Sequence, residues 1–169
     1  MRIRLLLFFL LFSALAFAEN GLTPRGKDRM DALINGDRAE KMAAARELQS
    51  IFKPETKIEL EKALKAKIES MNKSMPQQLD ESTLALGGLV SEGNILIMYQ
   101  ITIPDSEVTP FVKEYLKDYS KTQLINQACT DEGQLIGLLA GLEIRRTYST
   151  PTGKKLFDVD VDLNDCINR

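Results

Sequence analysis

The first half of the chain carries hydrophobic residues at helical spacing, which predicts an amphipathic helical region over residues 23–75. Thr23-Pro24 places an N-cap before a proline, and Asn35-Gly36 is typical of a helix end. Asp37 can cap a following helix, and Pro54 interrupts that helix because proline disrupts a helix interior. The helix after this proline has an apolar stripe made of Leu60, Leu64, Ile68, Met71 and Met75.

The hydrophobic period then changes to two and predicts strands over residues 83–90 and 95–103. Gly87-Gly88 indicates a bulge in the first of them, because glycine weakens a regular strand. Alternate residues of the second strand are apolar or aromatic, and Leu96 and Met98 occupy its other side. We therefore expect this strand to be central in a sheet and buried on both faces near its start.

Two more helices are predicted after these strands. Thr109 caps a helix that begins at Pro110 and ends at about Ala128, and a short helix follows between Asp131 and Gly141. The longer helix has one apolar face, which we expect to pack in the core. That face carries Phe111, Tyr115, Tyr119, Thr122, Ile125 and Cys129.

The chain ends in two further alternating segments, residues 142–148 and 155–163, which predict a hairpin. A symmetric turn would place Arg145 opposite Asp158. The order of elements is therefore α-α-β-β-α-α-β-β, which indicates an α+β fold. We expect a four-stranded, mostly antiparallel sheet packed with helices, in a single domain of residues 19–169.

Residues 1–18 have the pattern of a secretory signal peptide. Arg2 and Arg4 precede an apolar run, and Ala16-Phe17-Ala18 is a small-x-small cleavage site. We expect cleavage before Glu19. The alternative is a membrane anchor, but the apolar run is shorter than the roughly 20 residues that a spanning helix needs. No later segment is apolar enough to span a bilayer, so the mature chain is expected to be periplasmic or secreted.

Composition narrows the possible chemistry. The 169 residues include 22 Lys and Arg, 24 Asp and Glu, and no His. The absence of His excludes a Ser-His-Asp triad and any imidazole metal ligand. Removing Arg2 and Arg4 with the signal peptide leaves 20 basic and 24 acidic residues, a net charge of −4. With that charge and no basic block, nucleic acid is a poor partner.

The chain has two cysteines, Cys129 and Cys166, which allow one intramolecular pairing. An exported protein folds where disulfides persist, so we expect these residues to form a structural disulfide. A reactive thiol is the alternative, and the usual signals for one, a Cys-x-x-Cys motif or a His partner, are missing.

The acidic clusters have simpler interpretations than catalysis or metal binding. Asp80 and Glu81 could act as an acid–base pair, but they lie at a helix-to-strand junction where acidic residues are common. Asp158, Asp160 and Asp162 resemble the start of a calcium loop, yet Leu163 and Arg169 stand where that loop needs Gly and Glu. We therefore expect no catalytic residue, no metal and no cofactor.

Aromatic and methionine side chains could line a ligand groove between helices and sheet. The candidate lining is Met98, Tyr99, Phe111 and Tyr115. Such a groove would suit a carrier of lipid or another small ligand, although tyrosines at these spacings are more often core residues with solvated hydroxyls.

The C-terminal half resembles a group of small exported bacterial domains without assigned chemistry. The matching segments lie between about residues 70 and 166. They are Met75–Thr83, Glu92-Gly93-Asn94, Ala128–Asp131, the Leu-rich turn to Gly141, Ile144–Tyr148, Gly153 and Asp165-Cys166. Some proteins of this group are provisionally described as quorum-sensing-regulated virulence factors. The resemblance implies an α+β fold and export, and it implies no active-site residues.

These observations favour an exported, non-enzymatic protein that binds another envelope or extracellular protein. The contact would involve the helical N-terminal region or an edge of the sheet, and the resemblance implies a virulence-associated factor. A periplasmic carrier of a small ligand or lipid is the alternative.

Overall fold

The computed structural model describes residues 24–51 and 54–169. The expected signal peptide, residues 1–18, and its cleavage site lie outside these residues. The region predicted as helical contains three helices where the predicted order had two, because both the Asn35-Gly36 stop and Pro54 interrupt it. They are α2 (Pro24–Asn35), α3 (Arg38–Gln49) and α4 (Pro54–Asn72).

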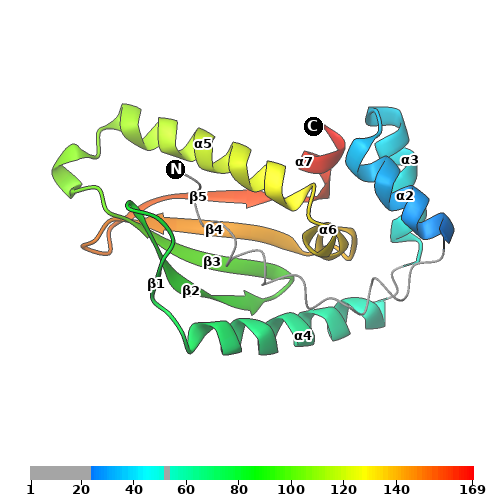
Figure 1. Ribbon diagram of the computed structural model, residues 1–169, viewed down its shortest axis with the longest axis horizontal. Helices are drawn as coiled ribbons and strands as arrows, with labels where there is room; N and C mark the ends of the chain where they lie inside the picture. Colours follow the sequence, from blue (N-terminus) through cyan, green and yellow to red (C-terminus); the bar gives the residue numbers. More distant parts are fainter. Residues whose placement is uncertain (1–23, 52–53) are drawn as a thin grey trace.

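Local capping explains where these helices begin and end. The Asp37 side chain accepts a hydrogen bond from the backbone of Glu40, and the Glu40 side chain accepts one in return from the backbone of Asp37, which forms a capping box. The predicted apolar stripe of α4 is confirmed at Leu60, Leu64 and Ile68, which are buried. Helices α2 and α3 pack against each other and against the short helices α6 (Glu132–Leu139) and α7 (Leu163–Ile167), at one end of the molecule (Figure 1).

The sheet has five strands in the order β1-β2-β3-β4-β5. They are β1 (Gln77–Gln78), β2 (Thr83–Ser91), β3 (Asn94–Ile101), β4 (Glu143–Ser149) and β5 (Lys155–Val161). The prediction of four mostly antiparallel strands is therefore corrected in two respects: β1 is an additional short strand, and the central pair β3–β4 is parallel. The parallel pairing has a topological cause, because α5 (Pro110–Ala128) and α6 carry the chain back to the end where β3 began.

Details of the strand pairing follow the sequence in part. The predicted bulge in β2 is confirmed, since its register with β3 shifts between Ala85 and Gly87. In the closing hairpin Arg145 lies opposite Asp160, two residues from the expected partner Asp158. A shift of two preserves the face of every side chain, so the inward and outward positions of the hairpin remain as predicted.

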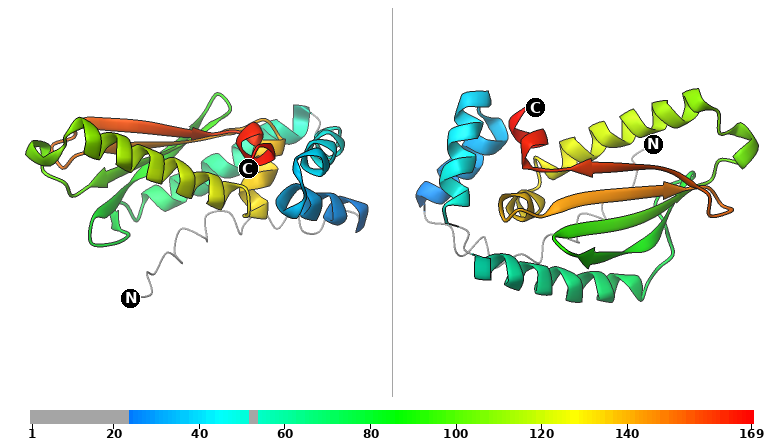
Figure 2. Two further views of the ribbon diagram at one scale, coloured as in Figure 1. Left: turned by 90° about the horizontal axis from the view of Figure 1, so that it is seen from above. Right: turned by 180° about the vertical axis from the view of Figure 1, so that it is seen from behind.

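Helices cover one face of the sheet. Helix α4 packs against β2, and its residue Asn72 donates a hydrogen bond to the backbone carbonyl of Gly88. Helix α5 packs against β5, and its residue Gln127 accepts a hydrogen bond from Arg146. Gly88 and Arg146 are both register partners of Ile97, so the two helices lie on the same face. Figure 2 shows the strands from behind, where no helix of the described residues crosses them. Strand β3 is therefore not enclosed on both faces as predicted, and Leu96 and Met98 on the bare face are only half-buried.

Candidate functional site

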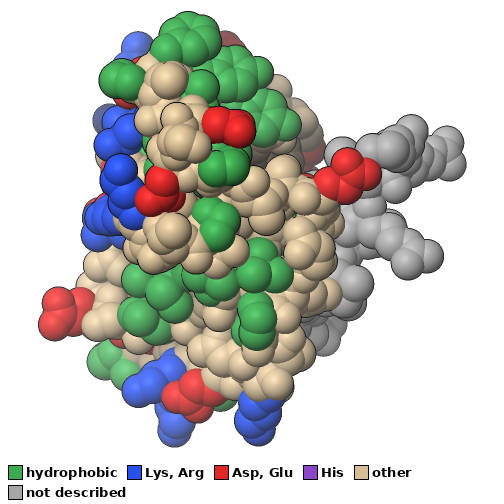
Figure 3. All heavy atoms as spheres, turned by 90° about the vertical axis from the view of Figure 1, so that its left-hand side faces the viewer, with side chains coloured by type: hydrophobic (Ala, Val, Ile, Leu, Met, Phe, Trp, Pro, Cys, Tyr) green, Lys and Arg blue, Asp and Glu red, His purple; other side chains and the backbone are tan. Residues whose placement is uncertain are grey.

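The exposed surface of α5 carries three aromatic side chains in successive turns. Phe111, Tyr115 and Tyr119 follow one another at i, i+4 and i+8, and they are 80%, 62% and 56% exposed. We call these residues the aromatic row. Helix positions four apart lie on one inclined row, so the three rings form a continuous strip. Figure 3 faces the end of the molecule at which α5 begins and shows hydrophobic side chains gathered there.

A neighbouring row of α5 packs on the sheet. It consists of Val112, Leu116, Ser120, Leu124 and Ala128, of which the last three are buried. The prediction that Phe111, Tyr115 and Tyr119 pack in the core is therefore wrong, whereas Ile125 and Cys129 of the same predicted face do pack there. The row that begins with Val112 stays apolar or small along the whole helix, and α5 packs against β5. The aromatic row instead continues into the polar residues Gln123 and Gln127.

Two contacts fix the orientation of α5. Gln127, the last member of the inclined row that contains the aromatic residues, accepts a hydrogen bond from Arg146 on β4 at 2.6 Å. On the opposite flank Lys121 donates to the backbone carbonyl of Asp160 on the edge strand β5 and lies 3.0 Å from the Asp165 carboxylate. The flank that carries the aromatic row therefore faces the middle of the sheet, and the flank that carries Lys121 faces its outer edge.

The sheet below this flank contains a cluster of three aromatic rings. The centroids of Tyr99 and Tyr148 are 5.2 Å apart, and those of Tyr148 and Phe157 are 4.8 Å apart. The guanidinium of Arg146 lies over the Tyr99 ring at 5.6 Å. Burial raises the pKa of Tyr99 to about 12, although the Arg146 charge lowers it. Tyr99 therefore remains neutral and is a packed residue of the sheet surface beneath α5 rather than an acid or a base.

The structure brings together only part of the predicted groove. Phe111 and Tyr115 are neighbours on α5, and Tyr99 lies on the helix-facing side of β3 but is buried. Met98, next to Tyr99 in the strand, points to the bare face of the sheet. The four predicted lining residues therefore divide between the exposed surface of α5 and the two sides of β3, and the described part of the chain does not bring them together: they are Met98, Tyr99, Phe111 and Tyr115.

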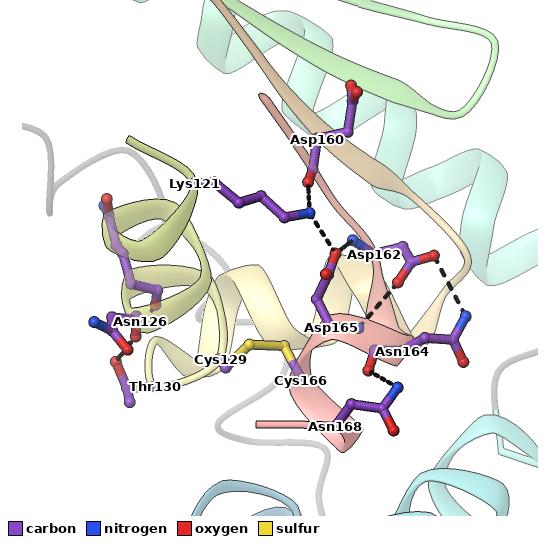
Figure 4. The surroundings of a disulfide bond; sticks show 11 residues. Lys121, Asn126, Cys129, Thr130, Asp160, Asp162, Asn164, Asp165, Cys166 and Asn168 are labelled. Carbon is purple, nitrogen blue, oxygen red and sulfur yellow. Dashed lines mark hydrogen bonds and ion pairs between the residues drawn. A yellow bond between two sulfur atoms is a disulfide. The ribbon is translucent and has the colours of Figure 1, made fainter. Parts of the chain in front are cut away.

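The predicted disulfide between Cys129 and Cys166 is present. It joins the end of α5 to α7, as Figure 4 shows. An open depression of about 510 Å³ lies beside it. The depression is lined by Thr122, Ile125, Asn126, Asp162, Asn164, Asp165, Asn168 and Arg169. Its acidic groups already have partners, because Asp165 binds Lys121 and Asp162 caps α7. The lining is therefore part of the attachment of α7 to α5.

The acidic clusters have structural roles. Asp158 binds Lys155 and Thr147, and Asp160 pairs with Arg145. Partial burial would raise the pKa of Asp80, but hydrogen bonds from Ser82 and Thr83 lower it below its usual value. A general acid needs the opposite shift. Within the described part of the chain, no three His, Cys, Asp or Glu side chains converge on a point that could hold a metal ion.

Sequence reasoning missed Arg146 as a residue of this surface. The signal was available, because Arg146 stands between Ile144 and Tyr148 at the inward positions of β4, where alternation predicts apolar side chains. Which flank of α5 faces Arg146 could not be derived from the pattern alone, since that depends on how the helix docks on the sheet.

Comparisons with known proteins identify the fold. No family model and no curated protein matches the sequence. A Pseudomonas aeruginosa structure, provisionally described as a secreted protein, is 18% identical with a TM-score of 0.53 and covers 64% of this chain and 94% of its own. The pilotin EpsS of the Vibrio vulnificus type 2 secretion system is 18% identical with a TM-score of 0.53 and covers 68% of this chain and 97% of its own. These similarities show a shared fold.

A further structure, the type II secretion pilotin AspS from Vibrio cholerae, is 14% identical with a TM-score of 0.48, covering 66% of this chain and 96% of its own. Among the helices of the described residues, none combines the length and the apolar composition needed to cross a membrane.

Proposed function

We propose that this chain is an exported, non-enzymatic protein of the bacterial envelope or extracellular space that binds another protein through the aromatic row of α5. The observation that carries the proposal is the exposure of Phe111, Tyr115 and Tyr119 on a helix whose other apolar row is buried. Contiguous exposed apolar patches with polar surroundings are typical of protein-binding sites. Aromatic side chains supply much of the binding energy at such sites while losing little side-chain entropy.

The fold supports the same class of role. It is shared with a pilotin of a type 2 secretion system, a component of protein-export machinery, and with a protein described as secreted. By analogy, the partner is a protein of the envelope, and the chain assists its placement or assembly. The absence of His in the sequence and the lowered pKa of Asp80 fit a protein without catalytic chemistry. A contribution to virulence would follow if the partner exports virulence proteins.

Site-specific photo-crosslinking in the native host tests the proposal. A photoreactive phenylalanine analogue replaces Tyr115, and the matched control carries it at Leu89, a 42% exposed residue of β2 whose register partner Leu96 lies on the bare face. We expect one adduct of defined mass with an envelope protein at position 115, and no such adduct at position 89. Adding Phe111→Ser and Tyr119→Ser should abolish the adduct. Equal adducts at both positions would contradict the proposal.

Complementation then tests whether the contact has a function. A strain lacking the protein is complemented with the wild type, with the triple variant Phe111→Ser, Tyr115→Ser, Tyr119→Ser, or with Leu89→Ser. The amounts of protein released into the medium and of the crosslinked partner in the membrane fraction are measured. We expect the wild type and the Leu89 variant to restore both quantities. Full restoration by the triple variant would show that the aromatic row is not the functional contact.

A further inference from the structure

Two consecutive arginines of β4 have opposite environments. Arg145 lies on the bare face of the sheet, opposite Asp160, and forms a salt bridge with it. Arg146 lies on the helix-facing side, where its register partners are Ile97 and Val159. Placing a guanidinium beside apolar side chains costs free energy unless a counter-charge or hydrogen bonds compensate for the lost hydration.

The contacts of Arg146 orient its charge without neutralising it. Its Nη2 donates to the neutral amide of Gln127 at 2.6 Å, and its guanidinium lies 5.6 Å from the centroid of the Tyr99 ring. The described residues form five salt bridges, and Arg146 takes part in none of them. Its Nε is buried and has no hydrogen-bond acceptor among residues 24–51 and 54–169. An unsatisfied buried donor of this kind requires an explanation.

A carboxylate is the ligand that such a group selects. The planar guanidinium presents parallel N–H donors that match the two oxygens of a carboxylate, and a fixed orientation reduces the entropy lost on binding. We infer that Arg146 binds an Asp or Glu side chain of the partner segment that lies along the aromatic row. The inference rests on the proposed function and specifies the chemistry of its partner.

The layout of α5 adds two features of that segment. Tyr119 and Gln127 are eight residues apart, so the contact with Arg146 begins about 12 Å beyond the last aromatic ring. On the solvent side of the aromatic row, Glu114 and Asp118 lie three residues from Phe111 and Tyr115, close enough to attract basic side chains. The segment therefore carries apolar anchors flanked by Lys or Arg, and an acidic residue about 12 Å further along.

Selection from a peptide library tests the inference directly, because it requires no purified partner. A phage-displayed library of random peptides of about 16 residues spans about 24 Å as a helix, enough to reach from Phe111 to Gln127. Parallel selections use the mature wild-type protein, Arg146→Met, the matched control Arg145→Met, and the triple variant of the aromatic row. Display fusion blocks the peptide C-terminus, so only side-chain carboxylates are offered. Circular dichroism and thermal melting verify that each variant folds.

We expect the wild type and Arg145→Met to enrich peptides with apolar anchors and a spaced Asp or Glu. Arg146→Met should keep the apolar anchors and lose the acidic position. A selected peptide, synthesised as the amide, should bind Arg146→Met about ten to one hundred times more weakly than the wild type. Arg146→Lys keeps the positive charge but lacks the paired N–H donors, so it should bind the peptide with intermediate affinity. It also provides a second variant if Arg146→Met does not fold.

The two proposals fail in distinguishable ways. Apolar anchors without an acidic position on the wild type, or an acidic position that persists on Arg146→Met, would overturn the role of Arg146 and leave the proposed function standing. An unchanged consensus on the triple variant would overturn the aromatic row as the binding surface. A wild-type selection without any consensus would overturn both.

Discussion

Cys129, at the end of α5, is bonded to Cys166 of α7, which stands 37 positions later in the chain. Helix α7 also contacts α2, α3 and α6, so this bond connects the layer above the sheet to the N-terminal helices. The salt bridge between Lys121 and Asp165 is a second link between α5 and α7 (Figure 4).

Loss of this disulfide should destabilise the protein substantially. In the chain-entropy model, a loop closed over 37 positions contributes about 4 kcal/mol to the free energy of unfolding. We expect the double variant Cys129→Ser, Cys166→Ser to melt about 8 to 16 °C lower than the wild type in scanning calorimetry. The reduced wild type should behave similarly. An unchanged melting temperature in reductant, with free thiols demonstrated by mass spectrometry, would rule out this stabilising role.

Substitutions in the two rows of α5 should separate binding from stability. Leu124 is fully buried, so Leu124→Ala should lower the free energy of unfolding by about 2 to 5 kcal/mol in urea titrations. Tyr119 is largely exposed, so Tyr119→Ala should change it by no more than about 0.5 kcal/mol. If Tyr119→Ala is as damaging as Leu124→Ala, the aromatic row belongs to the core and cannot be a free binding surface.

The Asn72 side chain stabilises the bulge of β2. It accepts a hydrogen bond from the backbone N–H of Gly88 at 2.9 Å and donates one to the Gly88 carbonyl at 2.8 Å. Asn72→Ala should lower the free energy of unfolding by about 1 to 2 kcal/mol, because both backbone groups lose their partner. Lys73→Ala, at the next and exposed position, is the control and should have little effect. Equal stabilities in urea denaturation would show that the bulge does not depend on Asn72.

The pKa of Asp80 should depend on Ser82. Partial burial raises the pKa of the Asp80 carboxyl group. The backbone N–H and the hydroxyl of Ser82 donate hydrogen bonds to the carboxylate and lower the pKa below its ordinary value of 3.8. A carboxyl group whose pKa is lower in the folded state stabilises that state at pH values above its unfolded-state pKa. This stabilisation disappears as the pH falls through the folded-state pKa. In a carboxyl NMR titration, Ser82→Ala should raise the Asp80 pKa. A wild-type value above 3.8 would instead revive Asp80 as a candidate general acid.

Local features of the sequence were sufficient for much of the fold. Capping residues and prolines predicted where helices begin and end, as at Asp37 and Thr109, because these signals act within one turn of the chain. The bulge at Gly87 followed from glycine within a strand. The disulfide followed from the expected export of the chain and from its having only two cysteines.

Other features depend on contacts between distant segments. The parallel pairing of β3 and β4 is set by how α5 and α6 cross the sheet, and no residue within either strand specifies it. The hairpin could move by two residues without exposing a core side chain, so Arg145 was assigned the wrong aspartate.

Periodicity, caps and the cysteine count were enough to predict an α+β domain with a disulfide, because these are local or compositional properties of the chain. Which row of α5 is buried depends instead on how the helix docks on the sheet. Both rows begin with apolar or aromatic residues, and docking on β5 selects the one that remains small or apolar to Ala128. That docking leaves Phe111, Tyr115 and Tyr119 exposed and brings Gln127 to Arg146, so the surface that we propose for binding is a product of packing.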